Sequence, residues 1–156
     1  MSWLSGSESE IRRGMLVFQR LEIMRSITGV STADAHWKPH PEANSLIEIM
    51  NHLAWVEWWW FECIVGGVQA DWPGGDRGPG FDVEPEETPE AVQAAYVASF
   101  SRSNEIWDRT GLDKTFDSDA GKVSLRWIII HMIEETARHA GHADITRQLI
   151  DGSKAT

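Results

Sequence analysis

Three histidines and one glutamate follow one another at helical spacing between residues 131 and 142. They are His131, Glu135, His139 and His142. At about 100° per residue, all four fall within roughly 80° of one another around an α-helix, which is a narrow stripe. Imidazole and carboxylate groups on one stripe are typical of a site for a divalent metal ion. His131 and His139 are about 12 Å apart along the helix axis, so one ion takes at most two ligands from this helix.

A further ligand must come from another helix, and the candidate is His52. It shares a helical stripe with Ile49, Val56 and Trp59, so we expect its ring to face the core. Both ring nitrogens of a buried histidine need polar partners, and a zinc-like ion together with an acceptor on the other nitrogen supplies them. A core histidine paired with a carboxylate is the alternative interpretation.

Four helical segments have to position these residues. Apolar residues with a period of 3.6 predict helices over residues 7–28, 45–65, 88–110 and 124–150. Residues 45–48 form a capping box, and Pro89 follows Thr88 as the first helical residue. We expect no strand, and at most a locally extended stretch at residues 114–117. The predicted fold is all-α, a four-helix bundle that makes residues 1–156 a single domain.

The connection between the second and third helices, residues 71–87, is long and rich in glycine, proline and acidic residues. This composition does not favour regular structure. Loops of such length in a compact bundle are lids, binding loops or mobile segments, and a solvated connector is the alternative.

Composition excludes several classes of function. The formal charge of −10 argues against a nucleic-acid partner, because binding to phosphates requires clustered Lys and Arg. No apolar run approaches the roughly 18 residues of a membrane span. The first residues lack the pattern of a signal peptide, so we expect a cytoplasmic protein with a small-molecule ligand.

Cys63 is the single cysteine, which excludes an intrachain disulfide and a cysteine-rich zinc site. It follows His52 by about 16 Å of helix rise, too far to share an ion with it. We interpret it as a packed core thiol.

Two segments together resemble the DinB-like superfamily. They are residues 51–59 (NHLAWVEWW) and 125–144 (LRWIIIHMIEETARHAGHAD), followed by Asp151-Gly152. More narrowly, the chain is similar to the actinobacterial branch of DinB-type proteins related to mycothiol-dependent maleylpyruvate isomerase. The resemblance covers nearly the whole chain. It implies a four-helix bundle that holds one divalent ion, usually zinc or nickel, by three side chains near one end.

The resemblance also implies which residues bind the ion. Many relatives use one His with a His-x-x-x-His pair, and Glu135 occupies the first position of that pair here. The mycothiol-dependent branch is similar in having His, Glu and His, so the implied ligands are His52, Glu135 and His139. That set leaves a coordination position open for water or a thiolate. His142 is expected to support the ligands or to form part of the pocket wall, although the His139-x-x-His142 spacing also suits a metal. The cofactor thiol is expected to need a cationic contact, for which Arg138, Arg126 and Arg147 are the candidates.

The function implied is a metal-dependent thiol S-transferase or isomerase. Its nucleophile would be the metal-bound thiolate of mycothiol or a similar small thiol, and its second substrate an electrophile. Two other classes stay open: a hydrolase with metal-activated water and Glu134 or Asp144 as base, and a non-enzymatic metal- or ligand-binding stress protein. The tryptophans at 58–60 cannot all point inward, and the outward rings indicate a homodimer interface or a pocket rim.

Overall fold

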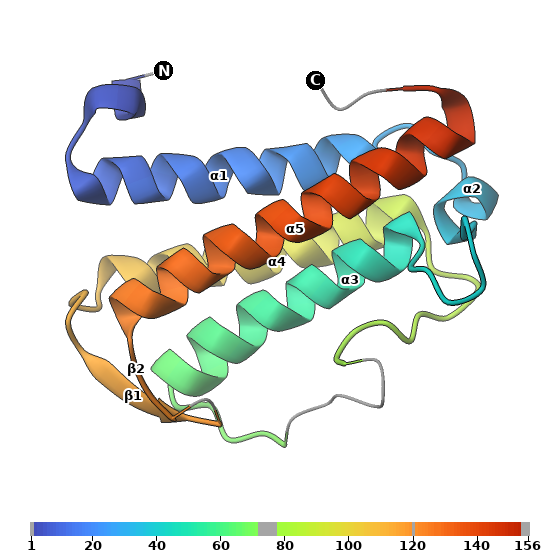
Figure 1. Cartoon of the computed structure of the whole chain (residues 1–156). Coiled ribbons are helices and arrows are strands. Elements are labelled where there is room, and N and C mark those ends of the chain that lie inside the picture. Colours follow the sequence, from blue (N-terminus) through green and yellow to red (C-terminus); the bar gives the residue numbers. More distant parts are fainter. Residues whose placement is uncertain (1, 72–77, 120, 154–156) are drawn as a thin grey trace.

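The computed structural model describes residues 2–71, 78–119 and 121–153, and the chain is mostly helical (Figure 1). The long helices are α1 (Glu8–Ile27), α3 (Leu46–Glu57), α4 (Pro89–Asp108) and α5 (Leu125–Asp151). A π-helical segment, η2 (Trp58–Val65), continues α3, and there are two short pieces, η1 (Ser2–Ser5) and α2 (Thr32–His36), of which α2 contributes the buried Ala35 to the core. The all-α class expected from the sequence is confirmed at this level.

Each long helix begins where a side chain satisfies its first free N–H groups. Ser7 with Glu10 and Ser45 with Glu48 form complete capping boxes at α1 and α3. At α4 and α5, hydroxyls of Thr88 and Ser124 accept from the backbone of the third residue on. The expected helix boundaries therefore agree with the structure to within about two residues.

The prediction of no strands was wrong for one short segment. Strands β1 (Thr115–Ser118) and β2 (Gly121–Ser124) pair antiparallel, with Thr115 opposite Ser124 and Ser118 opposite Gly121. Four-residue strands are too short to display a clear period of two. The hairpin leads into α5, and its Val123 side chain is buried against the core. It therefore helps to set where α5 begins.

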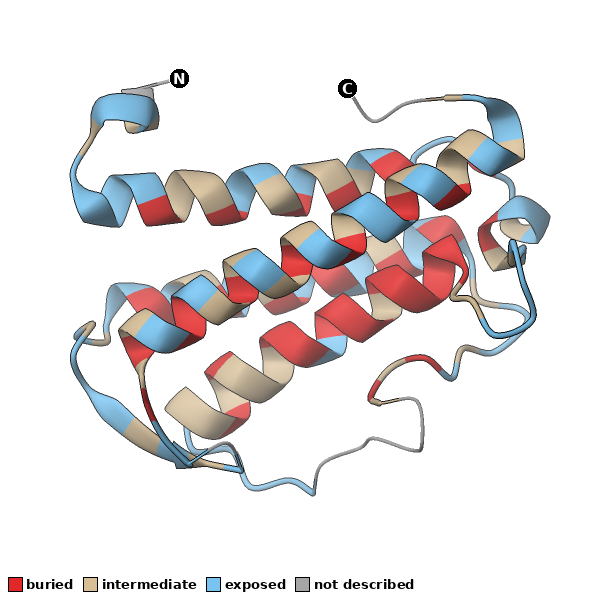
Figure 2. Cartoon of the chain, in the orientation of Figure 1, coloured by how far each residue is buried: buried red, intermediate tan, exposed pale blue. Residues whose placement is uncertain are grey.

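The helix α3 is the centre of the fold. It packs against α4 on one side and α5 on the other, while α5 also lies along α1. Figure 2 shows buried residues along most of α3, whereas the other long helices alternate between buried and exposed positions. A side chain on the α5-facing side of α3 is thus held in a protected seam between two helices. No helix among the described residues is long and apolar enough to cross a membrane.

A buried ion pair ties α1 to the end of α3. Both carboxylate oxygens of Glu57 accept from Arg20, at 2.7 and 2.8 Å, and neither side chain is more than 3% exposed. Asn104 accepts a further bond from Arg20 at 3.0 Å. Because each charge is fully paired, the burial of this pair is tolerated.

Candidate metal centre

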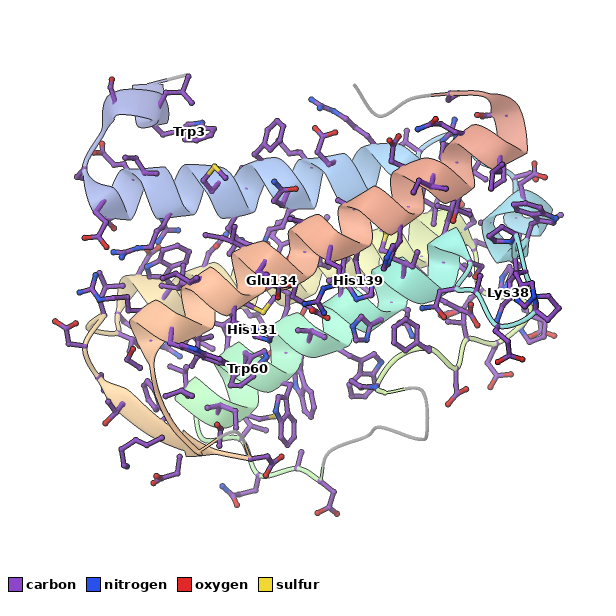
Figure 3. The ribbon with its side chains drawn as sticks, viewed as in Figure 1. Trp3, Lys38, Trp60, His131, Glu134 and His139 are labelled. Carbon is purple, nitrogen blue, oxygen red and sulfur yellow. The ribbon has the colours of Figure 1, made fainter. Side chains whose placement is uncertain are left out.

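The structure brings His52, Glu135 and His139 together between α3 and α5. Nε2 of His52 lies 3.2 Å from Oε1 of Glu135, and Nε2 of His139 lies 3.1 Å from the same oxygen. One ligand atom from each residue falls within 4.8 Å of the other two, and no second such group occurs in the described part of the chain. Figure 3 shows His139 on the side of α5 that faces α3.

The loop after residue 77 closes this site from the side of α3. The Pro79 carbonyl accepts a bond of 2.6 Å from Nδ1 of His52, and the Gly80 carbonyl accepts one of 2.9 Å from Asn51. The Phe81 ring stacks on the His52 ring, with centroids 4.1 Å apart and an interplanar angle of 13°. The connection between the second and third predicted helices therefore contacts the site through residues 79–81, while residues 72–77 lie outside the described residues.

The hydrogen bond to Pro79 determines which nitrogen of His52 carries a proton. A carbonyl only accepts, so Nδ1 donates, and neutral His52 presents a lone pair on Nε2 toward Glu135. Two acceptors at 3.2 Å repel each other unless a positive charge lies between them. That charge is either the proton of an imidazolium or a divalent ion, and two imidazoles with one carboxylate are a donor set suited to zinc.

The surroundings of Glu135 keep its carboxyl group ionised, which is the form that binds a metal ion. Where protons rather than an ion lie between these atoms, hydrogen bonds from His139 and then from His52 hold the pKa of Glu135 well below its ordinary value, although burial acts in the opposite direction. The carboxylate is thus ionised across the neutral range, as a metal ligand must be.

Arg138 and His142 lie at the outer edge of the site. Arg138 is exposed and donates to the second carboxylate oxygen of Glu135 at 3.2 Å, while also pairing with Glu134. His142 is exposed, meets the His139 ring edge-on at 5.6 Å, and lines a pocket of about 300 Å³ between α5 and the start of α3. Both residues are therefore accessible to a molecule that approaches Glu135 and His139 from solvent.

His131 belongs to a separate aromatic cluster. Its ring stacks on Trp127, with centroids 5.0 Å apart, and contacts Trp60 edge-on at 5.2 Å. The cluster lies one helical turn before Glu135, and Figure 3 shows His131 and Trp60 side by side between α5 and α3. Rings of all three residues are partly exposed, so Trp60 of the 58–60 run presents part of its ring to solvent beside His131.

The other candidate residues lie apart from the centre or are already paired. Arg126 pairs with Glu8 and Asp113, and Arg147 pairs with Asp151. Glu134 is exposed and bonded to Arg138, which leaves it poorly placed as a general base. Cys63 is buried, and burial together with Glu62 raises the pKa of its thiol.

Comparison with known proteins identifies the family. The profile described as mycothiol-S-transferase matches residues 12–152. The chain belongs to the mycothiol S-transferase family. No curated protein matches significantly. A solved structure described as a conserved protein from Enterococcus faecalis is similar, with a TM-score of 0.66 and 16% identity over 96% of this chain and 100% of the other. That likeness shows the fold alone, and together with the family match it confirms the DinB-like resemblance.

Sequence reasoning did not find Pro79 and Phe81. Both residues contact His52, although they lie 27 or more positions after it in the sequence. No local sequence pattern predicts a contact between residues so far apart. The one available signal was the Gly78-Pro79-Gly80 run, which is typical of a tight backbone turn. Gly80 has φ of +76°, and a Cβ there would lie 2.6 Å from Trp55 and 2.7 Å from the His52 backbone.

Proposed function

We propose that this protein is a metal-dependent S-transferase that joins mycothiol, or a similar small thiol, to an electrophile. The observation that carries the proposal is the convergence of His52, Glu135 and His139 on one point in a chain of this family. These three side chains would hold a divalent ion, zinc or nickel by their chemistry. When bound, the ion would lower the pKa of the thiol sulfur and so supply a thiolate at neutral pH.

The residues of the chain would prepare the site around that sulfur. Pro79 fixes the proton of His52 on Nδ1, which leaves Nε2 free to act as a ligand. Phe81 covers one face of the His52 ring and keeps water from it. With a thiol pKa lowered from about 8.5 toward neutrality, the thiolate fraction at pH 7 rises roughly tenfold.

The two ends of the site would bind different parts of the substrates. On one side, Arg138 offers N–H donors and His142 a pocket wall, which suits the polar body of the thiol. On the other side, the stacked rings of Trp127 and His131 offer a flat apolar surface, which suits the electrophile. Between them, sulfur and electrophile would be held in contact, and proximity adds the larger part of the rate.

The proposal is accompanied by inferences about the domain organisation, the oligomeric state and the location of the protein. We infer that residues 1–156 form a single domain built as a four-helix bundle. A homodimer is inferred from exposed aromatic rings outside the surface that Trp127 and His131 form, such as Trp55, which is 37% exposed. A cytoplasmic location would suit the chemistry, because small thiols are kept reduced there.

Turnover of a generic electrophile tests the proposal. We expect conjugation of monochlorobimane to require both mycothiol and a divalent ion, and to be lost on chelation or in His52→Ala. His40→Ala is the matched control, because His40 is exposed and bonds only within its own turn. Cleavage of ester or amide substrates at full rate without any thiol would instead assign the protein to the metal-dependent hydrolases. Stoichiometric metal with no reaction of either kind would favour the non-enzymatic stress protein.

A further inference from the structure

A pocket separate from the candidate metal centre lies between α3 and α4, which run side by side (Figure 1). We call it the α3–α4 pocket. Its walls are two helical stripes: Asn51, Ala54, Trp55 and Trp58 from α3 and the start of η2, and Ala95, Ser99 and Arg102 from α4. Its volume of about 470 Å³ falls in the range of about 300–1,000 Å³ that is typical of small-molecule sites. None of these residues has a part in the proposed reaction.

Two indole rings give the pocket an aromatic wall. Trp55 and Trp58 meet edge to face, with centroids 5.2 Å apart and an interplanar angle of 87°. One ring can therefore cover the face of a flat molecule while the other closes its edge. The hydroxyl of Ser99 donates to the Ala54 carbonyl at 2.9 Å, so it is engaged within the protein. Such a wall favours a planar aromatic ligand.

Arg102 is the charged residue of the pocket wall. Its Nε donates to Glu62 at 2.7 Å, which places it at the end of the pocket nearest η2. No hydrogen bond of its two terminal nitrogens occurs among the described residues, and its side chain is 48% exposed. Both nitrogens can thus donate to one carboxylate of a ligand. An aromatic wall beside an arginine favours an aromatic molecule with a negative charge.

Two residues of the pocket also hold the loop that covers His52. Asn51 donates to the Gly80 carbonyl at 2.9 Å, and a Cβ at Gly80 would lie 2.6 Å from Trp55. Gly80 stands between the residue that accepts a hydrogen bond from His52 and the residue that stacks on its ring. A molecule packed against Asn51 and Trp55 would restrain both residues where they touch the loop.

We propose that the α3–α4 pocket binds a planar aromatic anion, and that the bound molecule holds residues 79–81 against His52. The aromatic part lies on the pair of Trp55 and Trp58, and the carboxylate accepts from Arg102. A ligand that stabilises the closed loop stabilises the orientation of His52, so it favours metal binding. Binding to the pocket does not depend on the proposed reaction, and only the link to zinc rests on the proposed metal centre.

Calorimetric titration of metal-free protein with 2-naphthoate tests the pocket. We expect Ala95→Leu, which fills the pocket from the exposed face of α4, to weaken binding tenfold or more. Ala94→Leu is the matched control, because Ala94 is the exposed neighbour on α4 and does not line the pocket. Equal affinities of wild type and Ala95→Leu for 2-naphthoate would overturn the pocket as the binding site.

The neutral analogue 2-naphthol tests the role of the charge. Arg102→Gln should weaken 2-naphthoate about tenfold and leave the affinity for 2-naphthol unchanged. A variant with a damaged pocket would lose both ligands, so the pair separates loss of charge from loss of structure. Equal losses for the two compounds would overturn the assigned anion contact.

Zinc affinity tests the link to the loop. We expect saturating 2-naphthoate to tighten Zn²⁺ binding about fivefold in competition with a chromophoric chelator, and to have no effect in Ala95→Leu. Unchanged zinc affinity in the wild type would overturn the link. A wild type that binds 2-naphthoate but no zinc would overturn the metal centre, and the titration of metal-free protein would still support the pocket.

A second copy of the chain is the competing occupant, because the homodimer is also inferred from Trp55. Sedimentation of wild type and Trp55→Ala distinguishes the two. A wild type that binds no 2-naphthoate, together with a Trp55→Ala protein that changes from dimer to monomer, would show that the second copy fills the pocket and would overturn the proposal. Trp37→Ala is the control for loss of an exposed indole elsewhere, since Trp37 is 42% exposed.

Discussion

His52 and His139 present the same atom, Nε2, to the Glu135 carboxylate, but they are held in different ways. The His52 ring is fixed on its far side by a backbone carbonyl and on its face by Phe81. The His139 ring has no such contact on Nδ1 and is flanked by His142. At the scale of the residue, the site is thus one rigid and one less constrained imidazole sharing a single carboxylate.

Replacement of His139 tests the register of the site. We expect His139→Ala to bind no stoichiometric zinc at neutral pH, because two ligands remain and only one of them is an imidazole. His131→Ala should retain one ion per chain, since its ring is engaged with Trp127 and Trp60. Elemental analysis of the purified proteins measures both. The reverse pattern would move the ion one turn earlier, onto His131 and Glu135.

Glu135 should make the stability of the metal-free protein depend on pH. Its pKa is depressed in the folded state, so its contribution to the free energy of unfolding is complete above the unfolded-state pKa of about 4.3 and declines below it. We expect the difference in urea midpoint between wild type and Glu135→Gln to be largest near neutral pH. That difference should shrink as the pH falls below about 4.5. A difference in urea midpoint that grew on acidification would contradict a lowered pKa of Glu135.

At the scale of the element, the loop at residues 79–81 and the helix α3 form one unit. The loop reaches α3 through two carbonyl groups and one aromatic ring. The contact is close because Gly80 has no side chain, and its backbone lies directly on α3. The loop therefore determines the orientation of His52, although it supplies no ligand.

Two glycines with the same backbone conformation but different surroundings distinguish the effect of a steric contact from the effect of backbone strain. Gly80 and Gly29 have φ of +76° and +75°, but a Cβ at Gly29 would meet nothing within 4 Å. We expect Gly29→Ala to cost about 1 kcal/mol of stability through its φ alone and to leave zinc affinity unchanged. Gly80→Ala should cost more and weaken zinc by tenfold or more, because the loop must move off His52. Equal zinc affinities for the two variants would show that the loop does not position His52.

At the scale of the whole molecule, the chain has one thiol, and it is buried away from the proposed site. Any sulfur chemistry must then come from an added thiol. We expect Cys63→Ala to keep its metal and its conjugation rate, with a loss of stability of the order of 1 kcal/mol. Thermal unfolding and the bimane assay measure the two effects. Loss of conjugation in a folded, metal-loaded Cys63→Ala protein would mean that the protein thiol takes part.

Much of this molecule could be predicted from the sequence because its signals are local. Helix starts were found from capping residues such as Ser45 and Thr88, and each cap acts within three residues of its own position. The stripe on α5 was found because one helical turn joins Glu135 to His139. His52 was a candidate because its helical stripe faces the core, but its partner lies 83 residues away, and the resemblance to a family was what assigned the two to one ion.

The features that the sequence did not predict depend on tertiary packing. The π-helical winding of Trp58–Val65 is one, because nothing in a run of tryptophans distinguishes it from an α-helix. The contact of Phe81 with His52 and the orphan Nδ1 of His139 are others. Each arises where two segments meet in space, so only coordinates of both segments reveal it.

The long stretch of sequence between His52 and Glu135 has a consequence for the amount of folded protein in a cell. An ion shared by residues 83 positions apart would act as a removable cross-link that closes about half of the chain into one loop. At a hundred times its dissociation constant, such an ion adds about 2.7 kcal/mol to the free energy of unfolding. The amount of folded protein would then follow the availability of the metal, and starvation for the ion would expose the chain to proteolysis.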